Sequence, residues 1–290
     1  MSGPLLVTGG SGYLGHALLR SAEPPVVATH LTSPAAPVPG VEWLRLDVRD
    51  AAAVERTFAE LRPAAVIHTA YRQEEPEAWA TNTLGAANVA RAAARAGARL
   101  VHVSTDLVFD GTAARPYTEE DEPIPVTPYG RTKLEGEREV RAAHPNALVV
   151  RTSLMVGGGE PGRQERAVLA AARGESDIAF FEDERRSPVL VDDLAAALVE
   201  LAGRRERGLL HVAGPEAVSR HELACLIAAA HGLASGRLRR GRLAGSGLQR
   251  PANCVLDSSR ARALLRTPIR GVSELAGLAD RAAHRPPPGP

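Results

Sequence analysis

The stretch Leu5-Leu-Val-Thr-Gly-Gly-Ser-Gly-Tyr-Leu-Gly15 decides the fold of this chain. A short apolar run, Leu5–Val7, comes directly before glycines spaced Gly-x-x-Gly-x-x-Gly at Gly9, Gly12 and Gly15, and a helical pattern follows. Glycines at this spacing allow a tight turn, close approach of the main chain to a pyrophosphate and close packing of helix on strand, and the helix N-terminus attracts phosphates. The stretch therefore predicts a strand, a dinucleotide-binding loop and a helix.

Short apolar runs alternate with helical patterns through the first half of the chain. The predicted strands are Leu5–Val7, Val26–Thr29, Trp43–Leu46, Ala65–Thr69, Leu100–Ser104 and Ala147–Arg151. The predicted helices are Tyr13–Ser21, Ala51–Leu61, Trp79–Ala96 and Tyr129–Ala143. Strands without strict alternation, separated by helices, indicate a parallel sheet covered on both faces. We therefore expect an α/β protein with a doubly wound parallel sheet of the Rossmann type and right-handed crossovers.

The second half is less regular and predicts a smaller lobe. A loop rich in Pro, Gly and acidic residues runs from Asp110 to Pro128, and such loops either bind ligands or are simply solvated. Residues 1–151 are expected to form the NAD(P)-binding domain. Residues 152–280 are expected to form mainly a substrate-binding lobe, with segments that return to the first domain. Residues 281–290 end in Pro-Pro-Pro-Gly-Pro and are expected to be disordered.

Composition excludes several classes of function. The formal net charge is +1, which gives no basis for electrostatic binding to nucleic acid or to a membrane surface. The cysteines, Cys225 and Cys254, have no metal-binding spacing, so we expect reduced thiols, no metal site and a cytoplasmic protein. The N-terminus leads directly into a strand, and neither a signal peptide nor a membrane span is expected.

Only one of the 35 Lys and Arg residues is a lysine, Lys133, and it follows Tyr129 by four residues. Thr127-Pro128 predicts a helix start, which places Tyr129 in the first turn and Lys133 one turn later on the same face. A neighbouring ammonium favours phenolate and is expected to lower the pKa of the Tyr129 phenol. Such a phenol can protonate a ketone oxygen as hydride reaches the carbon, and the lysine can hold the cofactor ribose.

A third polar group is expected beside this pair. The strand Leu100–Ser104 leads into Ser104-Thr105-Asp106, and ligands of doubly wound sheets bind beyond the carboxyl ends of the strands. Either Thr105 or Ser104 is therefore expected to hydrogen-bond the same oxygen as Tyr129.

Longer motifs show a family resemblance. They are Thr8–Gly15, Val103–Gly111, Pro116–Pro123, Tyr129–Gly136, Arg151–Ser153, Arg186–Leu194 and Leu210–Gly214. Through them the chain resembles the extended short-chain dehydrogenases/reductases and, more narrowly, the dTDP-4-dehydrorhamnose reductase family, over most of its length up to about residue 265. The segment from His68 to Arg72 departs from the family pattern, which is rich in Ala and Thr there.

The resemblance implies a cytoplasmic enzyme of carbohydrate biosynthesis that reduces a 4-keto-6-deoxy sugar nucleotide with NAD(P)H. The expected catalytic residues are Thr105, Tyr129 and Lys133. The expected cofactor-binding residues are Gly9, Gly12, Tyr13, Leu14, Gly15, His30, Asp47, Val48, Ala70, Tyr71, Asn82, Ser104, Tyr129 and Lys133. The expected substrate-binding residues are Asp106, Val108 and Arg186, with Arg163 and Arg166 as further candidates for the diphosphate.

The predicted second strand favours NADP over NAD. It ends with His30, Thr32 and Ser33 nearby and lacks the carboxylate that grips the ribose 2′-hydroxyl in NAD sites. Asp47 is open to two interpretations, a hydrogen bond to the adenine or a carboxylate at a helix N-terminus.

Two alternatives to the reductase stay open, and so does the oligomeric state. A sugar-nucleotide epimerase or dehydratase can share the scaffold, although related dehydratases have Thr-Asp-Glu where this chain has Thr105-Asp106-Leu107. A non-catalytic NADP-binding regulatory subunit can retain the same residues. A monomer or a homodimer is expected.

Overall fold

The computed structural model describes residues 3–32 and 37–275, so the predicted tail at 281–290 and Ser33 lie outside the described residues. Its centre is a seven-stranded sheet in the order β11-β6-β5-β4-β1-β2-β3, with every pairing parallel. The strands are β1 (Leu5–Thr8), β2 (Val26–His30), β3 (Val41–Arg45), β4 (Ala65–His68), β5 (Arg99–Thr105), β6 (Leu148–Thr152) and β11 (Gly208–His211). The expected doubly wound parallel sheet is confirmed.

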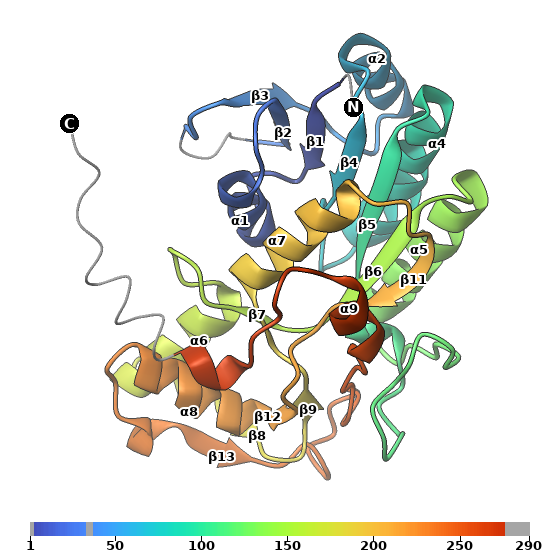
Figure 1. The fold of residues 1–290 in the computed structure, drawn as a ribbon. Helices are drawn as coiled ribbons and strands as arrows, with labels where there is room; N and C mark the ends of the chain where they lie inside the picture. Colours follow the sequence, from blue (N-terminus) through green and yellow to red (C-terminus); the bar gives the residue numbers. More distant parts are fainter. Residues whose placement is uncertain (1–2, 33–36, 276–290) are drawn as a thin grey trace, which may run out of the picture.

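Helices cover both faces of this sheet (Figure 1). They are α1 (Tyr13–Ser21), α2 (Ala51–Leu61), α4 (Ala86–Ala96), α5 (Pro128–Ala143) and α7 (Val191–Ala202). One core cluster joins α1 and α7 to the sheet through residues such as Leu18, Leu198 and Ile67. A second joins α2, α4 and α5 to the other face, with Phe58 and Val140 among its members. Burial of apolar side chains on both faces explains why these strands do not alternate in polarity.

A smaller lobe forms the lower part of the molecule in Figure 1. Its elements and their short connections are β7 (Met155–Val156), α6 (Arg163–Arg173), β8 (Ala179–Phe181), β9 (Arg185–Arg186), β10 (Val189–Leu190), β12 (Val218–Ser219), α8 (Arg220–Ala230), η3 (Ser235–Arg237), β13 (Arg239–Gly241) and η4 (Val272–Glu274). The helix α9 (Ser259–Leu264) lies against β11 and the core of the central sheet instead. The lobe's own apolar cluster packs α6 and α8 on β8. The strand β11 and the helix α7 come from the same half of the chain and lie with the central sheet.

The predicted helix Trp79–Ala96 is wrong in its first turns. The chain forms a short α3 (Glu77–Trp79), then a wider π-helical segment, η1 (Ala80–Gly85), and only then α4. In η1, Thr83 donates a hydrogen bond to the main-chain oxygen of Thr132 on α5 at 3.0 Å. Short π-helical segments are often found at functional sites. Here the wider turn directs polar side chains of η1 toward α5.

Two further observations concern the sequence expectations. Cys225 and Cys254 are both free thiols. Within residues 3–32 and 37–275, no helix has the length and apolar character needed to cross a bilayer.

Candidate active site

The sheet order reverses between β1 and β4, where the loops Gly9–Gly12 and Thr69–Tyr71 leave the carboxyl ends of the two strands. Gly9 has φ +72°, and a side chain on it would come within 2.8 Å of the Ala70 main chain. A side chain on Gly15 would strike the carbonyl oxygens of the same loop. Both positions therefore require glycine, as the sequence pattern predicts.

The N-terminus of α1 is suited to an anion. Its N-cap residue, Gly12, has no side chain to hydrogen-bond the first amides of the helix. The unpaired amides and the helix dipole together attract phosphate oxygens. The loop therefore fits the pyrophosphate of a dinucleotide.

The side chain of Tyr13 points away from this loop. Its hydroxyl donates to the main-chain oxygen of Gly157 and, at 3.0 Å, to the carboxylate of Glu165 on α6. Burial and the neighbouring Glu165 carboxylate raise the pKa of the Tyr13 phenol. Leu14 is buried in the core. Only the main-chain atoms of Tyr13 and Leu14 therefore remain available for the predicted cofactor contacts.

The residues predicted around the adenine half of the cofactor lie beyond β2 and β3. The His30 ring lies 6.2 Å from the Trp43 ring, between centroids. The Asp47 carboxylate makes a bidentate pair with Arg49, at 2.9 and 2.7 Å, and this hydrogen-bonded pairing lowers the pKa of Asp47. Val48 packs in the core on the α2/α4 side.

Asn82 holds the loop that follows β4. Its amide oxygen accepts from the Arg72 main-chain nitrogen at 2.9 Å, and its amide nitrogen donates to the Arg72 oxygen at 2.7 Å. The same nitrogen donates to the Thr132 hydroxyl on α5 at 2.9 Å. Asn82 is 1% exposed, and these hydrogen bonds use both its amide oxygen and its amide nitrogen. Its side chain therefore connects η1 to the Tyr71–Arg72 loop and to α5.

The expected catalytic residues come from β5 and α5. Thr105 ends β5 and caps the short helix η2 (Asp106–Val108), accepting from the Leu107 nitrogen at 3.2 Å. The helix α5 begins as predicted, with Thr127 as N-cap and Pro128 in the first turn, so Tyr129 and Lys133 lie on consecutive turns. Gly130 brings α5 against the main chain of η2, because a side chain there would strike the Leu107 oxygen.

Lys133 joins the two elements. Its ammonium donates to the Val103 main-chain oxygen at 2.7 Å, and only 3% of the residue is exposed. Burial lowers the pKa of Lys133 to about 8, and the Glu137 carboxylate one turn further along α5 acts in the opposite direction. The ammonium is therefore close to its titration point at physiological pH.

The expectation that Lys133 lowers the pKa of Tyr129 is wrong for this structure. Burial raises the pKa of the Tyr129 phenol, and Tyr71 and Asp106 raise it further. The physical reason is that Lys133 directs its ammonium to the Val103 oxygen, while an aromatic ring and a carboxylate lie near the phenol. The Tyr129 phenol therefore carries its proton at neutral pH.

Ser104 and Val108 face the protein interior. The Ser104 hydroxyl donates to the Glu137 carboxylate at 2.5 Å beneath α5. Glu137 also pairs with Arg151 on β6, at 2.7 Å between Oε2 and Nη2, and both side chains are almost fully buried. Val108 is fully buried in a cluster with Phe109 and Leu134. The side chains of Ser104 and Val108 therefore do not reach the surface at the end of β5.

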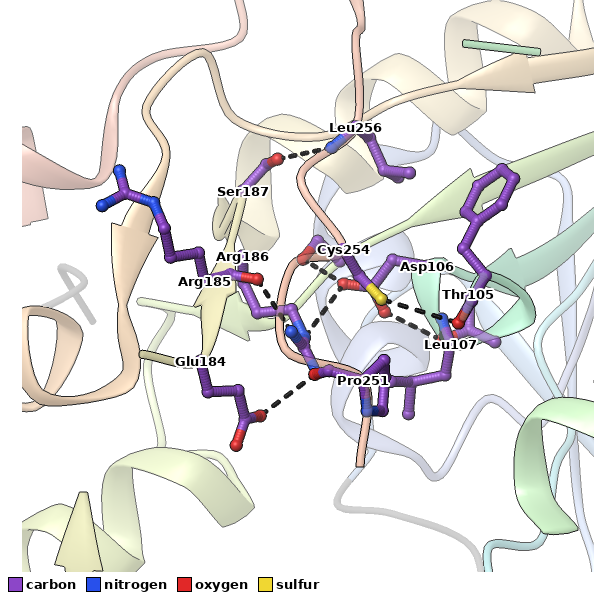
Figure 2. A network of polar contacts seen from close by, with 12 residues as sticks. Thr105, Asp106, Leu107, Glu184, Arg185, Arg186, Ser187, Pro251, Cys254 and Leu256 are labelled. Carbon is purple, nitrogen blue, oxygen red and sulfur yellow. Dashed lines mark hydrogen bonds and ion pairs between the residues drawn. The ribbon is translucent and has the colours of Figure 1, made fainter. Parts of the chain in front are cut away.

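Asp106 and Arg186 belong to a buried network beside Thr105 (Figure 2). The Asp106 carboxylate accepts from the Ser153 hydroxyl at 2.6 Å and lies 3.7 Å from the Arg186 guanidinium. Arg186 also donates to the Pro251 oxygen at 3.0 Å and pairs with Glu184 at 3.1 Å. Burial raises the pKa of Asp106 although Arg186 opposes the shift.

Two more arginines approach Glu184, and sequence reasoning missed both. Arg250 pairs with its carboxylate at 2.8 Å and Arg220 lies 4.0 Å away. Burial lowers the pKa of Arg220 to about 10. These positions carry no local spacing that could have identified them, because they come from separate loops and helices. The other arginine candidates lie elsewhere: Arg163 contacts Gln73, and Arg166 the Pro161 oxygen.

The dinucleotide loop, the parallel sheet and the Tyr129/Lys133 helix define an extended short-chain dehydrogenase/reductase. Within that class, the chain belongs to the RmlD substrate binding domain family, whose model matches residues 3–277.

Two curated relatives with different names are similar to this chain. A dTDP-4-dehydrorhamnose reductase of Mycobacterium tuberculosis is 40% identical over 231 residues, which cover 74% of this chain and 71% of the relative. The beta subunit of methionine adenosyltransferase 2 from Mus musculus is 33% identical over 297 residues, covering 93% of this chain and 86% of the relative.

Solved structures share the fold. A dTDP-4-dehydrorhamnose reductase from Bacillus anthracis in complex with NADP has a TM-score of 0.83 at 24% identity, covering 97% of this chain and 100% of that one. The Bordetella bronchiseptica enzyme WbmG in complex with NAD has a TM-score of 0.82 at 23% identity, covering 98% and 95%. At these identities the likeness concerns the fold alone.

Proposed function

We propose that this protein reduces the keto group of a nucleotide-linked 4-keto-6-deoxy sugar, as the name of its Mycobacterium tuberculosis relative indicates for that protein. The observation that carries the proposal is the Lys133–Val103 hydrogen bond of 2.7 Å, which joins the helix bearing Tyr129 to the strand ending at Thr105. An acid, a cation and a hydroxyl are the groups that a carbonyl reduction requires around the reacting oxygen.

Each residue has a distinct role in this proposal. Tyr129, protonated at neutral pH, donates its proton to the carbonyl oxygen, and Thr105 hydrogen-bonds that oxygen and orients it. The Lys133 ammonium bonds the Val103 oxygen and so holds α5, and with it Tyr129, beside the end of β5 where Thr105 lies. Asn82 braces the loop and the helix on either side of the site.

A nicotinamide cofactor fits the loop after β1, where glycine is required and the first amides of α1 lack a capping side chain. When bound, the reduced cofactor supplies the hydride. We favour NADPH because the end of β2 has His30 and Thr32 and no carboxylate for a ribose 2′-hydroxyl. Measuring kcat/KM with NADPH and with NADH tests this preference, and a strong NADH bias would refute it.

Charge near the site supports an anionic substrate. Three guanidinium groups, those of Arg186, Arg220 and Arg250, lie within 4.0 Å of the Glu184 carboxylate. The Asp106 carboxylate also lies near Arg186, so this cluster contains three basic and two acidic side chains. Arg186 is buried and Arg220 largely buried, whereas 43% of the Arg250 side chain is exposed, so the positive charge in excess lies at the surface of the cluster. The diphosphate of a nucleotide sugar would supply the missing negative charge.

The experiment is to follow NADPH absorbance with a panel of nucleotide-linked 4-keto-6-deoxy sugars. The Tyr129→Phe variant should lose about a hundredfold to ten-thousandfold in kcat while its affinity for NADPH is kept. Tyr117→Phe is the matched control, because its hydroxyl bonds Asp110, outside the proposed catalytic set. Undiminished turnover by Tyr129→Phe would refute the proton-donor role.

A second candidate function is a regulatory subunit that binds the cofactor without turnover. The relatives named as beta subunits of methionine adenosyltransferase 2 favour it, since they cover 93% of this chain. Tight NADPH binding without oxidation of NADPH by any substrate in the panel, together with a stoichiometric co-purifying methionine adenosyltransferase, would support this alternative.

A further inference from the structure

The ring of Tyr71 packs against the ring of Tyr129. The two centroids lie 6.1 Å apart and the planes make an angle of 64°, an edge-on arrangement that aromatic pairs prefer. Tyr71 lies just beyond the carboxyl end of β4, and Tyr129 lies in the first turn of α5. The contact therefore joins the loop after β4 to the proposed proton donor.

The main chain on both sides of Tyr71 is anchored. The hydroxyl of Thr69 donates to the Thr8 oxygen at 2.8 Å, at the end of β1. On the other side, both main-chain groups of Arg72 are bonded by the Asn82 amide, at 2.9 and 2.7 Å. With anchors two residues before it and one after it, the Tyr71 backbone is held in place even though its side chain is at the surface.

Half of the Tyr71 side chain is free. The residue is 50% exposed, so about half of its surface is open to solvent although its ring contacts Tyr129. One side of the ring contacts Tyr129, so a molecule that approaches the Tyr129 phenol from that side would meet the exposed part of Tyr71. A rigidly held aromatic in that place limits the size and orientation of the incoming group.

We propose that Tyr71 is a positioning and specificity-determining residue: it fixes the orientation of the Tyr129 ring and forms one wall of the space before the phenol. The role belongs to the ring rather than to the hydroxyl. This inference rests on the proposed function for its kinetic consequences, but the packing it describes is testable without any turnover.

The kinetic test compares Tyr71→Ala with Tyr71→Phe. Tyr71→Ala should lower kcat for the keto sugar roughly ten- to hundredfold, because a proton donor that is no longer fixed is misplaced. It should also narrow the difference in kcat/KM between small and bulky carbonyl substrates. Tyr71→Phe should restore most of the lost kcat. Trp79→Ala, which removes an aromatic of similar exposure (47%) outside this ring pair, should leave kcat unchanged.

Equal losses in Tyr71→Phe and Tyr71→Ala would overturn the ring-based role, since the hydroxyl would then be responsible. Unchanged kcat and substrate range in Tyr71→Ala would overturn the proposal altogether.

An activity-independent test uses nitration by tetranitromethane with peptide mapping, which is practical because the chain has four tyrosines. Tyr129 should be nitrated several-fold faster in Tyr71→Ala than in the wild type, and at the wild-type rate in Tyr71→Phe. An identical Tyr129 nitration rate in all three proteins would refute the packing role. If the wild type oxidises no NADPH but the nitration rates differ as expected, the proposed function fails and the positioning of Tyr129 by Tyr71 stands.

Discussion

Lys133 on α5 donates a hydrogen bond to the Val103 main-chain oxygen on β5 at 2.7 Å. Val103 lies two residues before Thr105, so this bond ties the helix that carries Tyr129 to the strand that presents Thr105. The ammonium is buried and compact, and a guanidinium would need more space and more acceptors than one carbonyl provides. This accounts for a lysine at the one position where the chain departs from arginine.

Replacing Lys133 with arginine should therefore not preserve activity. We expect Lys133→Arg and Lys133→Met each to lower kcat about a hundredfold or more, because the hydrogen bond that fixes the Tyr129 helix on β5 is lost and the proton donor is misplaced. Steady-state NADPH oxidation measures the effect. The exposed pair Arg138–Glu135 on α5 provides the control, since Arg138→Lys should leave kcat unaltered. Full activity in Lys133→Arg would show that only charge is needed at this position.

The pH dependence of kcat/KM should follow Lys133. Because burial lowers its pKa to about 8, the ammonium form is complete well below that pH and is lost above it, so kcat/KM should fall as the pH rises through about 8. Glu137→Gln removes a carboxylate that raises this pKa and should move the falling limb to lower pH. Glu135→Gln, on an outer face of α5, should leave the limb in place. A limb that does not respond to Glu137→Gln would contradict the assignment.

The buried Glu137–Arg151 pair should also be important for stability. Breaking such a pair leaves one charge uncompensated, so Glu137→Ala should lower the free energy of unfolding by about 3–5 kcal/mol. Replacing both residues with methionine should recover much of the loss, because apolar side chains of similar volume need no partner. Urea denaturation of the single and double variants measures this. A double variant no more stable than Glu137→Ala would count against the explanation.

Acid should destabilise the protein through a stacked histidine pair. His68 and His102 lie on β4 and β5 with ring centroids 5.2 Å apart, and burial lowers the pKa of His68 to about 3 and that of His102 well below its usual value. The unfolded chain binds protons near pH 6.5 and the folded chain does not. Stability is therefore lost as the pH falls below about 6.5, by up to about 1.4 kcal/mol per pH unit for each histidine.

His102→Phe tests this because it keeps a ring in the stack. Among the described residues, neither ring nitrogen of His102 has a hydrogen-bond partner, so the substitution leaves no partner unsatisfied. We expect the variant to gain stability over the wild type at pH 5 and to gain less at pH 8. An equal difference at the two pH values would show that His102 does not contribute to acid sensitivity.

Local patterns were sufficient for the central sheet and for the helix starts other than the one predicted at Trp79. The glycines at 9, 12 and 15 and the Thr127-Pro128 start are governed by neighbouring main-chain geometry, and the structure has both as predicted. Strands of two residues, such as β9 and β12, were missed because they are too short for periodicity. The π turn at Ala80–Gly85 depends on contacts with α5, which are remote in sequence.

The site was predicted less completely than the fold. The spacing of Tyr129 and Lys133 predicted a shared helical face but not where the ammonium points, and that direction depends on the Val103 carbonyl of another element. The arrival of Arg220 and Arg250 at Glu184 is likewise a tertiary property. A sequence with arginine throughout offers no local way to distinguish a buried guanidinium from a solvated one.

The Tyr13 hydroxyl should support the contact between the dinucleotide-binding domain and the second lobe rather than cofactor affinity. It donates to Gly157 and Glu165, and Gly162 at the start of α6 packs close to its ring. Tyr13→Phe keeps the ring but removes the donor to the Gly157 oxygen, while Glu165 keeps the amides of Gly157 and Gly162, so the free energy of unfolding should fall by about 1–3 kcal/mol. The Kd for NADPH, measured by fluorescence titration, should stay close to the wild-type value because the loop main chain is unaltered. A tenfold weaker Kd with undiminished stability would instead place the phenol in contact with the cofactor.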